Sequence, residues 1–452
     1  MGNVLLLLFS TLLICLAALY FNRKWPDIDV IDIYIIFIVL HFGIYPFIRG
    51  LHLESGVIFD SYNYNPLAII LVFVQLLLIV IIIKMVSKYF PAKNNNCLKI
   101  KTLIGQWASV NNFIIISLYS FLIIFQFISY FKYGVKSHIL PSDFDKIGKD
   151  LPYWFMSVRT TYNFLTLSVI IVLASKASLS EDRRRYVWLA LIIIFLPFVA
   201  YFGRKAFVNA AVMGAIIWLV NNEKRLFQLK NLKIATLLVL SFFIASNLYE
   251  TYRSNLHLVG VSLKKLENPI SAALNFKATL NNLKIRPGTW EFSYLVLDRQ
   301  MKGPGKVTTN GKITEEGFKS AIPRLLWPGK NFQITTEVLA DAYNAKIDDV
   351  SIGTNIFGVA QAELGYFSII VVPLTILLII IIMAGLLKMT ANYPVFLWLF
   401  SVNFLNFFMY IEENQSEISF MLRNIIILMA LFLSYYLVSR MITSLRTKGY
   451  TT

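Results

Sequence analysis

Cysteine and histidine are scarce in this chain, which has two cysteines and four histidines among 452 residues. Cys15 lies in the first apolar run and Cys97 in a basic stretch, so no disulfide framework is expected. The histidines show no spacing typical of metal ligands: His41, His52, His138 and His257. The sequence therefore predicts a fold without disulfides and a chemistry without a bound metal or other cofactor.

Charged residues are also few, at 15% of the chain, whereas 57% of the residues are hydrophobic and the mean hydropathy is +0.64. This composition excludes a water-soluble globule and requires lipid as the solvent. A nucleotide-binding loop, coiled-coil heptads and a repeat of fixed period are absent as well. We therefore predict an all-α polytopic membrane protein.

Apolar runs long enough to cross a bilayer recur along the chain, and about eleven helices follow from a span length of ~20 residues. The runs are Val4 to Phe21, Ile31 to Ile48, Pro66 to Val86, Asn112 to Tyr130, Val158 to Ala174, Val187 to Phe202, Ala206 to Val220, Ile234 to Tyr249, Tyr366 to Leu387, Tyr393 to Ile411 and Ile418 to Val438. The first run has no basic leader or small-residue cleavage site, so we interpret it as a retained helix.

Lysine and arginine collect on one side of the membrane when these helices alternate in direction. The basic clusters are Arg23-Lys24, the lysines between 84 and 101, Lys176 with Arg183-Arg184-Arg185, the residues between Lys224 and Lys233, Lys388, and Arg440 to Lys448. We predict that this side is cytoplasmic, which puts the amino terminus outside and the carboxyl terminus inside. The net charge of +17 is then explained by orientation and by binding to anionic membrane lipids, so nucleic-acid binding is not implied.

One outer connection is much longer than the others and divides the chain into three parts. Residues 1–249 hold helices one to eight, residues 250–365 form the large outer loop between helices eight and nine, and residues 366–452 hold helices nine to eleven with a cytoplasmic tail. Turn-forming stretches such as Lys302-Gly303-Pro304-Gly305 mark the loop, which has too few apolar residues for a core of its own. We expect amphipathic helices in it that lie over the mouth of the helical bundle.

Arginines are unexpectedly frequent on the outer side, where positive charge is normally avoided. They are Arg49, Arg159, Arg204, Arg253, Arg286, Arg299 and Arg324. Arg204 and Lys205 stand together in the tight connection between helices six and seven. Interfacial arginines commonly reach lipid headgroups, but several at helix ends can also converge on one pocket. Guanidinium binds phosphate through two parallel hydrogen bonds, so this set predicts an outer anion site.

Acidic residues give a weaker signal. Asp27, Asp29 and Asp32 fall at the predicted cytoplasmic face beside Arg23 and Lys24, so we interpret them as structural and charge-balancing rather than as metal ligands.

Aromatic residues also gather near the outer boundary, where they are typical of the membrane-anchoring belt. Trp290 and Trp327 lie in the outer loop instead, which favours stacking against sugar rings.

Three segments together resemble a known family. The stretch Ala321-Ile322-Pro323-Arg324-Leu325-Leu326-Trp327-Pro328-Gly329-Lys330 resembles the Pro-Arg-x-x-(Trp/Phe)-Pro-x-Lys signature of bacterial O-antigen and oligosaccharide repeat-unit polymerases of the Wzy type. Glu363-Leu364-Gly365-Tyr366-Phe367 resembles the Glu/Gly segment that follows it, and Phe202-Gly203-Arg204-Lys205-Ala206 resembles the Gly/Ser-Arg turn. The topology is similar over essentially the whole chain, although the Arg-x10-Gly loop motif of some members is absent.

The resemblance implies a GT-C-like membrane glycosyltransferase of the bacterial inner membrane, with a periplasmic amino terminus. It would polymerise undecaprenyl-pyrophosphate-linked oligosaccharide repeat units into O-antigen or related surface polysaccharide. Arginines would stabilise the pyrophosphate leaving group, so neither a nucleotide nor a metal is required. A polysaccharide chain-length regulator is the protein partner that the resemblance suggests.

The residues expected to carry this chemistry fall into two groups. The catalytic group is Arg204, Arg253, Arg324 and Glu250. The substrate-binding group is Arg159, Lys205, Tyr252, Arg299, Trp327, Lys330 and Glu363. The general base that activates the attacking hydroxyl stays open among Glu250, Glu291, Glu363 and His257, which qualify by location alone.

Three other functions remain open from the sequence. A purely structural or polymer-length-regulating membrane protein would have no reason to gather arginines at so many helix ends. An O-antigen ligase, which transfers the finished glycan to the lipid A core, would share the topology, the outer loop and the arginines. A flippase for lipid-linked oligosaccharide would carry charged residues inside its helices to line a cavity, and such charges are almost absent from the predicted spans. The sequence therefore favours a transferase over a transporter.

Overall fold

A computed structural model describes residues 2–44, 46–47, 66–89, 98–133, 151–195, 204–221, 293–294, 296–297, 300–301, 309–322, 326–327, 337–339, 342, 355–409 and 414–449, and the structural statements below concern these residues. Within these ranges the chain is helical, apart from turns and one isolated antiparallel bridge between Asp29 and Lys99.

The helices of the first half are α1 (Gly2–Lys24), α2 (Val30–Val39) with its π-helical continuation η1 (Leu40–Ile44), α4 (Pro66–Tyr89), α5 (Ile100–Ala108), α6 (Asn112–Phe127) with the π-helical η3 (Ile128–Lys132), α8 (Tyr153–Leu179), α9 (Arg183–Phe195) and α10 (Arg204–Asn221). The helices of the second half are α15 (Lys312–Ala321), α17 (Ile356–Leu364), the short 3-10 turn η6 (Gly365–Phe367), α18 (Ser368–Met389), α19 (Pro394–Met409) and α20 (Asn414–Gly449).

The all-helical membrane class predicted from the sequence is confirmed. Five of the described helical stretches are long and apolar enough to cross a membrane: Val4–Lys24, Pro66–Ile83, Asn112–Lys132, Ile356–Met389 and Ile418–Met441. Each predicted span overlaps a described helix except 234–249, which lies outside the described residues, as does the end of the span Val187 to Phe202 beyond Phe195. Some of these helices are shorter than a bilayer, among them Val30–Ile44 and Pro394–Met409, so the number of crossings remains a prediction.

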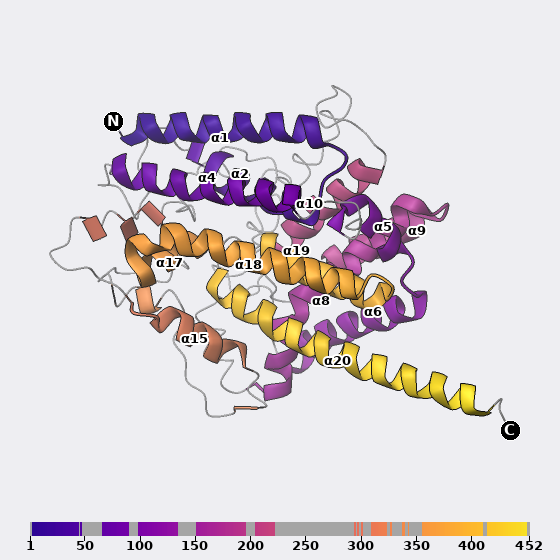
Figure 1. Ribbon diagram of the computed structural model, residues 1–452. Helices are drawn as coiled ribbons and strands as arrows, with labels where there is room; N and C mark the ends of the chain where they lie inside the picture. Colours follow the sequence, from indigo (N-terminus) through magenta and orange to yellow (C-terminus); the bar gives the residue numbers. More distant parts are fainter. Residues whose placement is uncertain are drawn as a thin grey trace, which may run out of the picture.

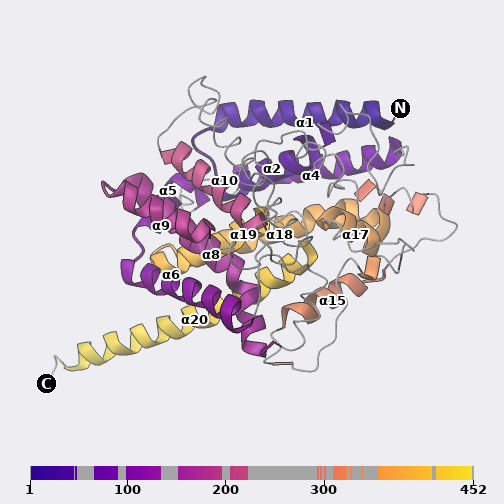
Figure 2. The ribbon, with the colours of Figure 1, turned by 180° about the vertical axis from the view of Figure 1, so that it is seen from behind.

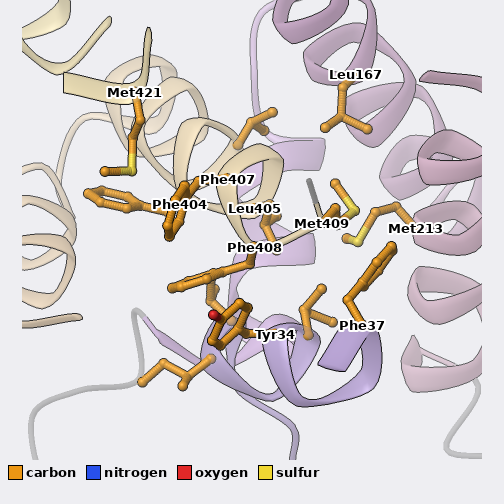
Figure 3. Close-up of a cluster of buried hydrophobic side chains, with 14 of the residues drawn as sticks. Tyr34, Phe37, Leu167, Met213, Phe404, Leu405, Phe407, Phe408, Met409 and Met421 are labelled. Carbon is orange, nitrogen blue, oxygen red and sulfur yellow. The ribbon is translucent and has the colours of Figure 1, made fainter. Parts of the chain in front are cut away.

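Helix α19 forms the centre of the bundle. It contacts α2, α5, α8, α18 and α20, and almost every side chain from Leu397 to Met409 is buried. A helix that is apolar around its whole circumference is expected to be enclosed by others. Figure 3 shows Phe404, Leu405, Phe407 and Phe408 among side chains from neighbouring helices, and the ring of Tyr34 lies 5.2 Å from that of Phe408.

The two chain ends lie at opposite ends of the molecule (Figure 1). Helices α1, α18 and α20 run in the same direction, so their basic carboxyl-terminal turns point the same way. Helices α15 and α17 lie near the end where the chain begins, and both views show this arrangement (Figures 1 and 2). We call this the α17 end and the opposite one the basic end.

The acidic series at the basic end is structural, as predicted. The Lys24 ammonium contacts Asp32 at 2.7 Å and Asp29 at 2.9 Å, and the Tyr20 hydroxyl donates to Asp32 across 2.6 Å. Asp32 is fully buried, so these contacts offset the cost of removing its charge from water. The more exposed pair of Lys99 and Asp27 is 3.7 Å apart. These contacts join the α1–α2 corner to the start of α5.

Helix α5 packs against the bundle at the basic end. No helix was predicted from the sequence at this position. Its Ile100, Leu103, Ile104 and Trp107 are buried against the bundle. The Trp107 indole N–H donates to the Ser401 hydroxyl of α19 across 2.9 Å. The Lys176 ammonium of α8 donates to the Ala108 carbonyl at the end of α5, where the helix dipole favours a cation.

Candidate functional site

Helix α15 and the last turn of α17 are joined at the α17 end. The Glu363 carboxylate accepts hydrogen bonds from the backbone N–H and the hydroxyl of Thr314, the former across 2.7 Å. The Thr309 N–H also donates to the Ala362 carbonyl across 2.9 Å. The first turn of a helix has N–H groups without intrahelical partners, and a carboxylate is a favourable acceptor there. Glu363 therefore caps α15 from a distant part of the chain.

Glycine at position 365 allows this arrangement. Gly365 ends α17 with φ of +58°, a conformation that residues with a Cβ rarely adopt. The chain turns there and continues through η6 into α18. Glu363 and Gly365 both belong to the segment that resembles the polymerase family. Glu363 binds the first turn of α15, and Gly365 makes the turn that follows α17.

Buried amides connect α4 to α17 and to the residues on either side of it in the sequence. The Gln75 amide of α4 donates to the Ser368 carbonyl across 2.9 Å, and the Gln361 amide donates to the Gln75 side chain across 3.2 Å. The Gln300 amide donates to the Gln361 carbonyl across 2.6 Å. Within the described part of the chain, the side-chain carbonyl of Gln361 and the hydroxyl of Ser368 are buried without a hydrogen-bond partner.

The same end contains a second buried pair, Ser293 and Asn355. The Ser293 hydroxyl donates to the Asn355 side chain across 2.9 Å, and Asn355 also accepts the Gly358 N–H at the start of α17. Tyr294, which follows Ser293 in the sequence, is also buried, and this burial raises the pKa of its phenol well above the usual range. Its hydroxyl therefore stays neutral at any physiological pH.

A third polar group lies between α19 and α20. The Asn424 amide donates to the Asn403 side chain across 3.1 Å, and the Asn403 amide donates to the Met421 carbonyl across 3.2 Å. The Arg423 guanidinium donates to the Asn424 side chain across 3.2 Å and lies 4.9 Å from the centroid of the Phe420 ring. An arginine within a transmembrane stretch is costly and marks a functional-site candidate.

The predicted site residues are described to different extents. Arg159 is half-buried on α8, and Trp327 is exposed beside exposed Leu326. Arg204 and Lys205 begin α10, although only their backbone is described. The remaining predicted residues lie outside the described residues: Arg253, Arg324, Glu250, Tyr252, Arg299 and Lys330, together with Glu291 and His257.

Hydrogen bonds between neighbouring helices show the relative heights of three arginines. The Trp398 indole of α19 donates to the Ser168 carbonyl of α8 across 3.0 Å, so these two residues stand at one height in the bundle, the Ser168 level. At 1.5 Å per residue, Arg159 lies about 13 Å from this level along α8. The height of Arg423 follows from α19, because Asn403 of that helix is bonded to Asn424 of α20. Counted from Trp398 to Asn403 and then from Asn424 to Arg423, it lies about 9 Å from the Ser168 level in the same direction.

Arg204 falls at a similar height. The Asn221 amide at the end of α10 donates to the Ser178 carbonyl of α8 across 2.9 Å, and these two helices contact each other. Ser178 lies about 15 Å from the Ser168 level toward the basic end. Arg204 lies about 25 Å from Asn221 along α10, in the direction of the α17 end. The difference puts Arg204 about 10 Å from the Ser168 level, on the side of the α17 end. Along the helix axes, Arg159, Arg204 and Arg423 therefore differ in height by about one helical turn or less, each on a different helix.

Arg423 and the buried glutamines were not among the residues predicted from the sequence. Arg423 lies inside the predicted span Ile418 to Val438, and its charge within that apolar run was the available signal. Gln75 stands in the run Val72-Phe73-Val74-Gln75-Leu76, where a polar residue needs a partner inside the bundle. The partners of Gln75 come from distant segments, so no local pattern identifies those partners.

Comparison with other proteins adds no assignment: no family model, curated protein or solved structure gives a significant match to this chain.

Proposed function

We propose that this chain is a GT-C-like membrane glycosyltransferase that polymerises undecaprenyl-pyrophosphate-linked repeat units on the outer face of the bacterial inner membrane. The observation that carries the proposal is the contact between Glu363 and Thr314. It joins α15, which ends at Ala321, to the last turn of α17. The helix that leads into the segment 321–330 is thereby joined to the segment 363–367, and both segments resemble the polymerase family.

The proposed reaction needs positive charge at that end. An acceptor hydroxyl attacks the anomeric carbon of the donor glycan, the bond from that carbon to the pyrophosphate oxygen breaks, and the leaving group takes the electron pair. Arginines fixed in a site of low water content stabilise this charge by several kcal/mol. Arg204, Arg253 and Arg324 are proposed for this role, with Arg159, Arg299, Lys205 and Lys330 binding the substrate phosphates.

The acidic and aromatic residues have different proposed roles. Glu250 is the proposed base that takes the proton of the attacking hydroxyl. Tyr252 and Trp327 are proposed to stack against sugar rings, and Trp327 is exposed as this requires. Since Glu363 already accepts two hydrogen bonds from Thr314, we propose that it contributes by positioning α15 beside the substrate.

The packing at the basic end favours a transferase over a flippase. A transporter must open to both sides of the membrane, whereas Trp107 is fully buried there and bonded to the central helix α19. Helix α5 is also capped by Lys176. Opening this end would break both hydrogen bonds and expose a large aromatic side chain. A ligase fits the same packing, so the acceptor has to be identified by experiment.

The test is polymerisation by purified protein in lipid nanodiscs, supplied only with undecaprenyl-pyrophosphate-linked repeat units and excess EDTA. We expect a ladder of elongated products. Arg204→Ala should abolish it, and Arg204→Lys should restore it poorly because an ammonium does not reproduce the guanidinium fork. Arg440→Ala, at the basic end, is the control. A full ladder from Arg204→Ala would refute the role of this arginine, and transfer only to a lipid A core acceptor would identify a ligase.

A further inference from the structure

The exposed side of α15 is polar where the helix begins and apolar where it ends. It carries four residues at intervals of three or four positions, the spacing that places residues on one side of a helix: Gly311, Glu315, Phe318 and Ile322. The opposite side is buried, with Ile313 and Gly317 at its centre. Phe318 is 49% exposed and Ile322 is 38% exposed. Two large apolar side chains therefore face outward at the end of this helix.

Helix α15 runs from the α17 end toward the basic end. Its first turn is held at the height of the last turn of α17, because the Thr314 N–H donates to Glu363. From there α15 continues beside α20, which it contacts, and both views show it pointing away from α17 (Figures 1 and 2). At 1.5 Å per residue, Phe318 lies about 6 Å and Ile322 about 12 Å beyond Thr314 along the helix. The apolar end of α15 therefore lies closer to the basic end than its polar start does.

Helix α18 shows what surrounds the molecule at this height. Gln75 binds both Ser368 and Gln361, so the start of α18 and the end of α17 stand at similar heights. Ile370 and Leu374 follow about 3 Å and 9 Å beyond Ser368 along α18, and both are exposed. They belong to a helical stretch that is long and apolar enough to cross a membrane, so their surroundings are lipid. The apolar end of α15 stands at similar heights and is therefore also at the level of lipid.

We propose that the apolar end of α15, with Phe318 and Ile322, inserts into the leaflet at the α17 end, which is the outer leaflet in the predicted orientation. Leu326, which follows the helix and is 76% exposed, belongs to the inserted surface. Lipid is the partner that fits, because a polar start and an apolar end match the passage from headgroups to hydrocarbon. Lys319, beside Phe318, is paired with Glu315 at 2.7 Å, and its long stem lets the ammonium stay at headgroup level. Helix α15 is thus an interfacial helix, whichever reaction the protein catalyses.

Spin labels on the full-length protein in lipid nanodiscs test this placement. The two native cysteines are first replaced by Cys15→Ala and Cys97→Ala. A single label is then attached through Phe318→Cys, Ile322→Cys or Leu326→Cys. Collisions of each label are measured with oxygen, which concentrates in hydrocarbon, and with a neutral nickel chelate, which stays in water. We expect collisions with oxygen to exceed those with the chelate at all three positions.

The matched control is Lys312→Cys, on the exposed polar start of the same helix, where collisions with the chelate should exceed those with oxygen. An excess of chelate collisions at Phe318→Cys and Ile322→Cys would overturn the insertion and leave both side chains in water. Few collisions with either reagent would overturn it too, because a protein surface, such as a second copy of this chain, would then cover the helix. If these two variants fail to fold, the strongly exposed Leu326 carries the test, and an excess of chelate collisions at Leu326→Cys would refute the insertion.

Discussion

Asn424 of α20 donates a hydrogen bond to Asn403 of α19 across 3.1 Å, and this bond joins the last membrane helix to the centre of the bundle. Both side chains are buried. In an apolar bundle, such a bond keeps two polar groups satisfied that have no alternative partner in lipid. It also orients Arg423, which donates to the same asparagine.

We predict that these asparagines are energetically coupled. Asn403→Leu and Asn424→Leu should each destabilise the protein: the first leaves the buried Asn424 amide N–H without its acceptor, and the second leaves the buried Asn403 side-chain oxygen without its donor. The double variant should lose less than the sum, with a coupling of about 0.5–1.5 kcal/mol. Reversible unfolding in detergent, followed by tryptophan fluorescence, measures this cycle. Ser434→Ala is the control, because that exposed hydroxyl bonds only within its own helix. Strict additivity would contradict the coupling.

The Trp107 side chain should be essential for closing the basic end. Trp107→Ala removes a fully buried ring and should cost about 3–5 kcal/mol, whereas Trp107→Phe keeps most of the volume and loses mainly the bond to Ser401, about 1 kcal/mol. Thermal unfolding of the purified variants ranks them. Trp188→Ala serves as the control, because that side chain is exposed on α9. Similar stabilities of Trp107→Ala and Trp188→Ala would show that α5 does not seal the bundle.

The two ion pairs at the α1–α2 corner should differ strongly in their contribution to stability. Asp32→Ala leaves Lys24 and Tyr20 without their buried partner and should cost about 3–5 kcal/mol. Lys99→Ala removes a longer and more exposed pair with Asp27 and should cost less than about 1 kcal/mol. Denaturation in detergent at constant ionic strength compares the variants. Equal effects would mean that burial of Asp32 does not decide its contribution.

Substitution of Glu363 can distinguish two roles of its carboxylate, as a cap of α15 and as a general base. Glu363→Gln keeps an oxygen acceptor for Thr314 but cannot take a proton, so it should retain most polymer formation and the protease resistance of α15. Glu363→Ala should lose both, because the first turn of α15 loses its acceptor at a cost of about 1 kcal/mol. Limited proteolysis and product ladders are measured on the same samples. A complete loss of polymer in Glu363→Gln with α15 still protected would assign Glu363 a chemical role instead.

The sequence by itself determined the class of this protein and the positions of its helices. Long apolar runs are local features, and a backbone in lipid must satisfy its own hydrogen bonds, so runs such as Pro66 to Val86 had to become helices. The role of Asp29 and Asp32 was also predictable, because oppositely charged neighbours stood close by in the sequence. Helix bounds shifted by a few residues, as with α8, which begins at Tyr153 rather than Val158.

Only the tertiary structure decided which polar groups meet. Gln75 and Gln361 bond to each other although they are 286 positions apart in the sequence, and Glu363 caps α15 from 49 positions away. Helix α5 gave no spanning signal because it is short, and its place beside α19 depends on Trp107 reaching Ser401. Such contacts arise because burial in lipid forces each polar side chain to find a partner. Which partner it finds is decided by how the helices pack, and local sequence does not encode that.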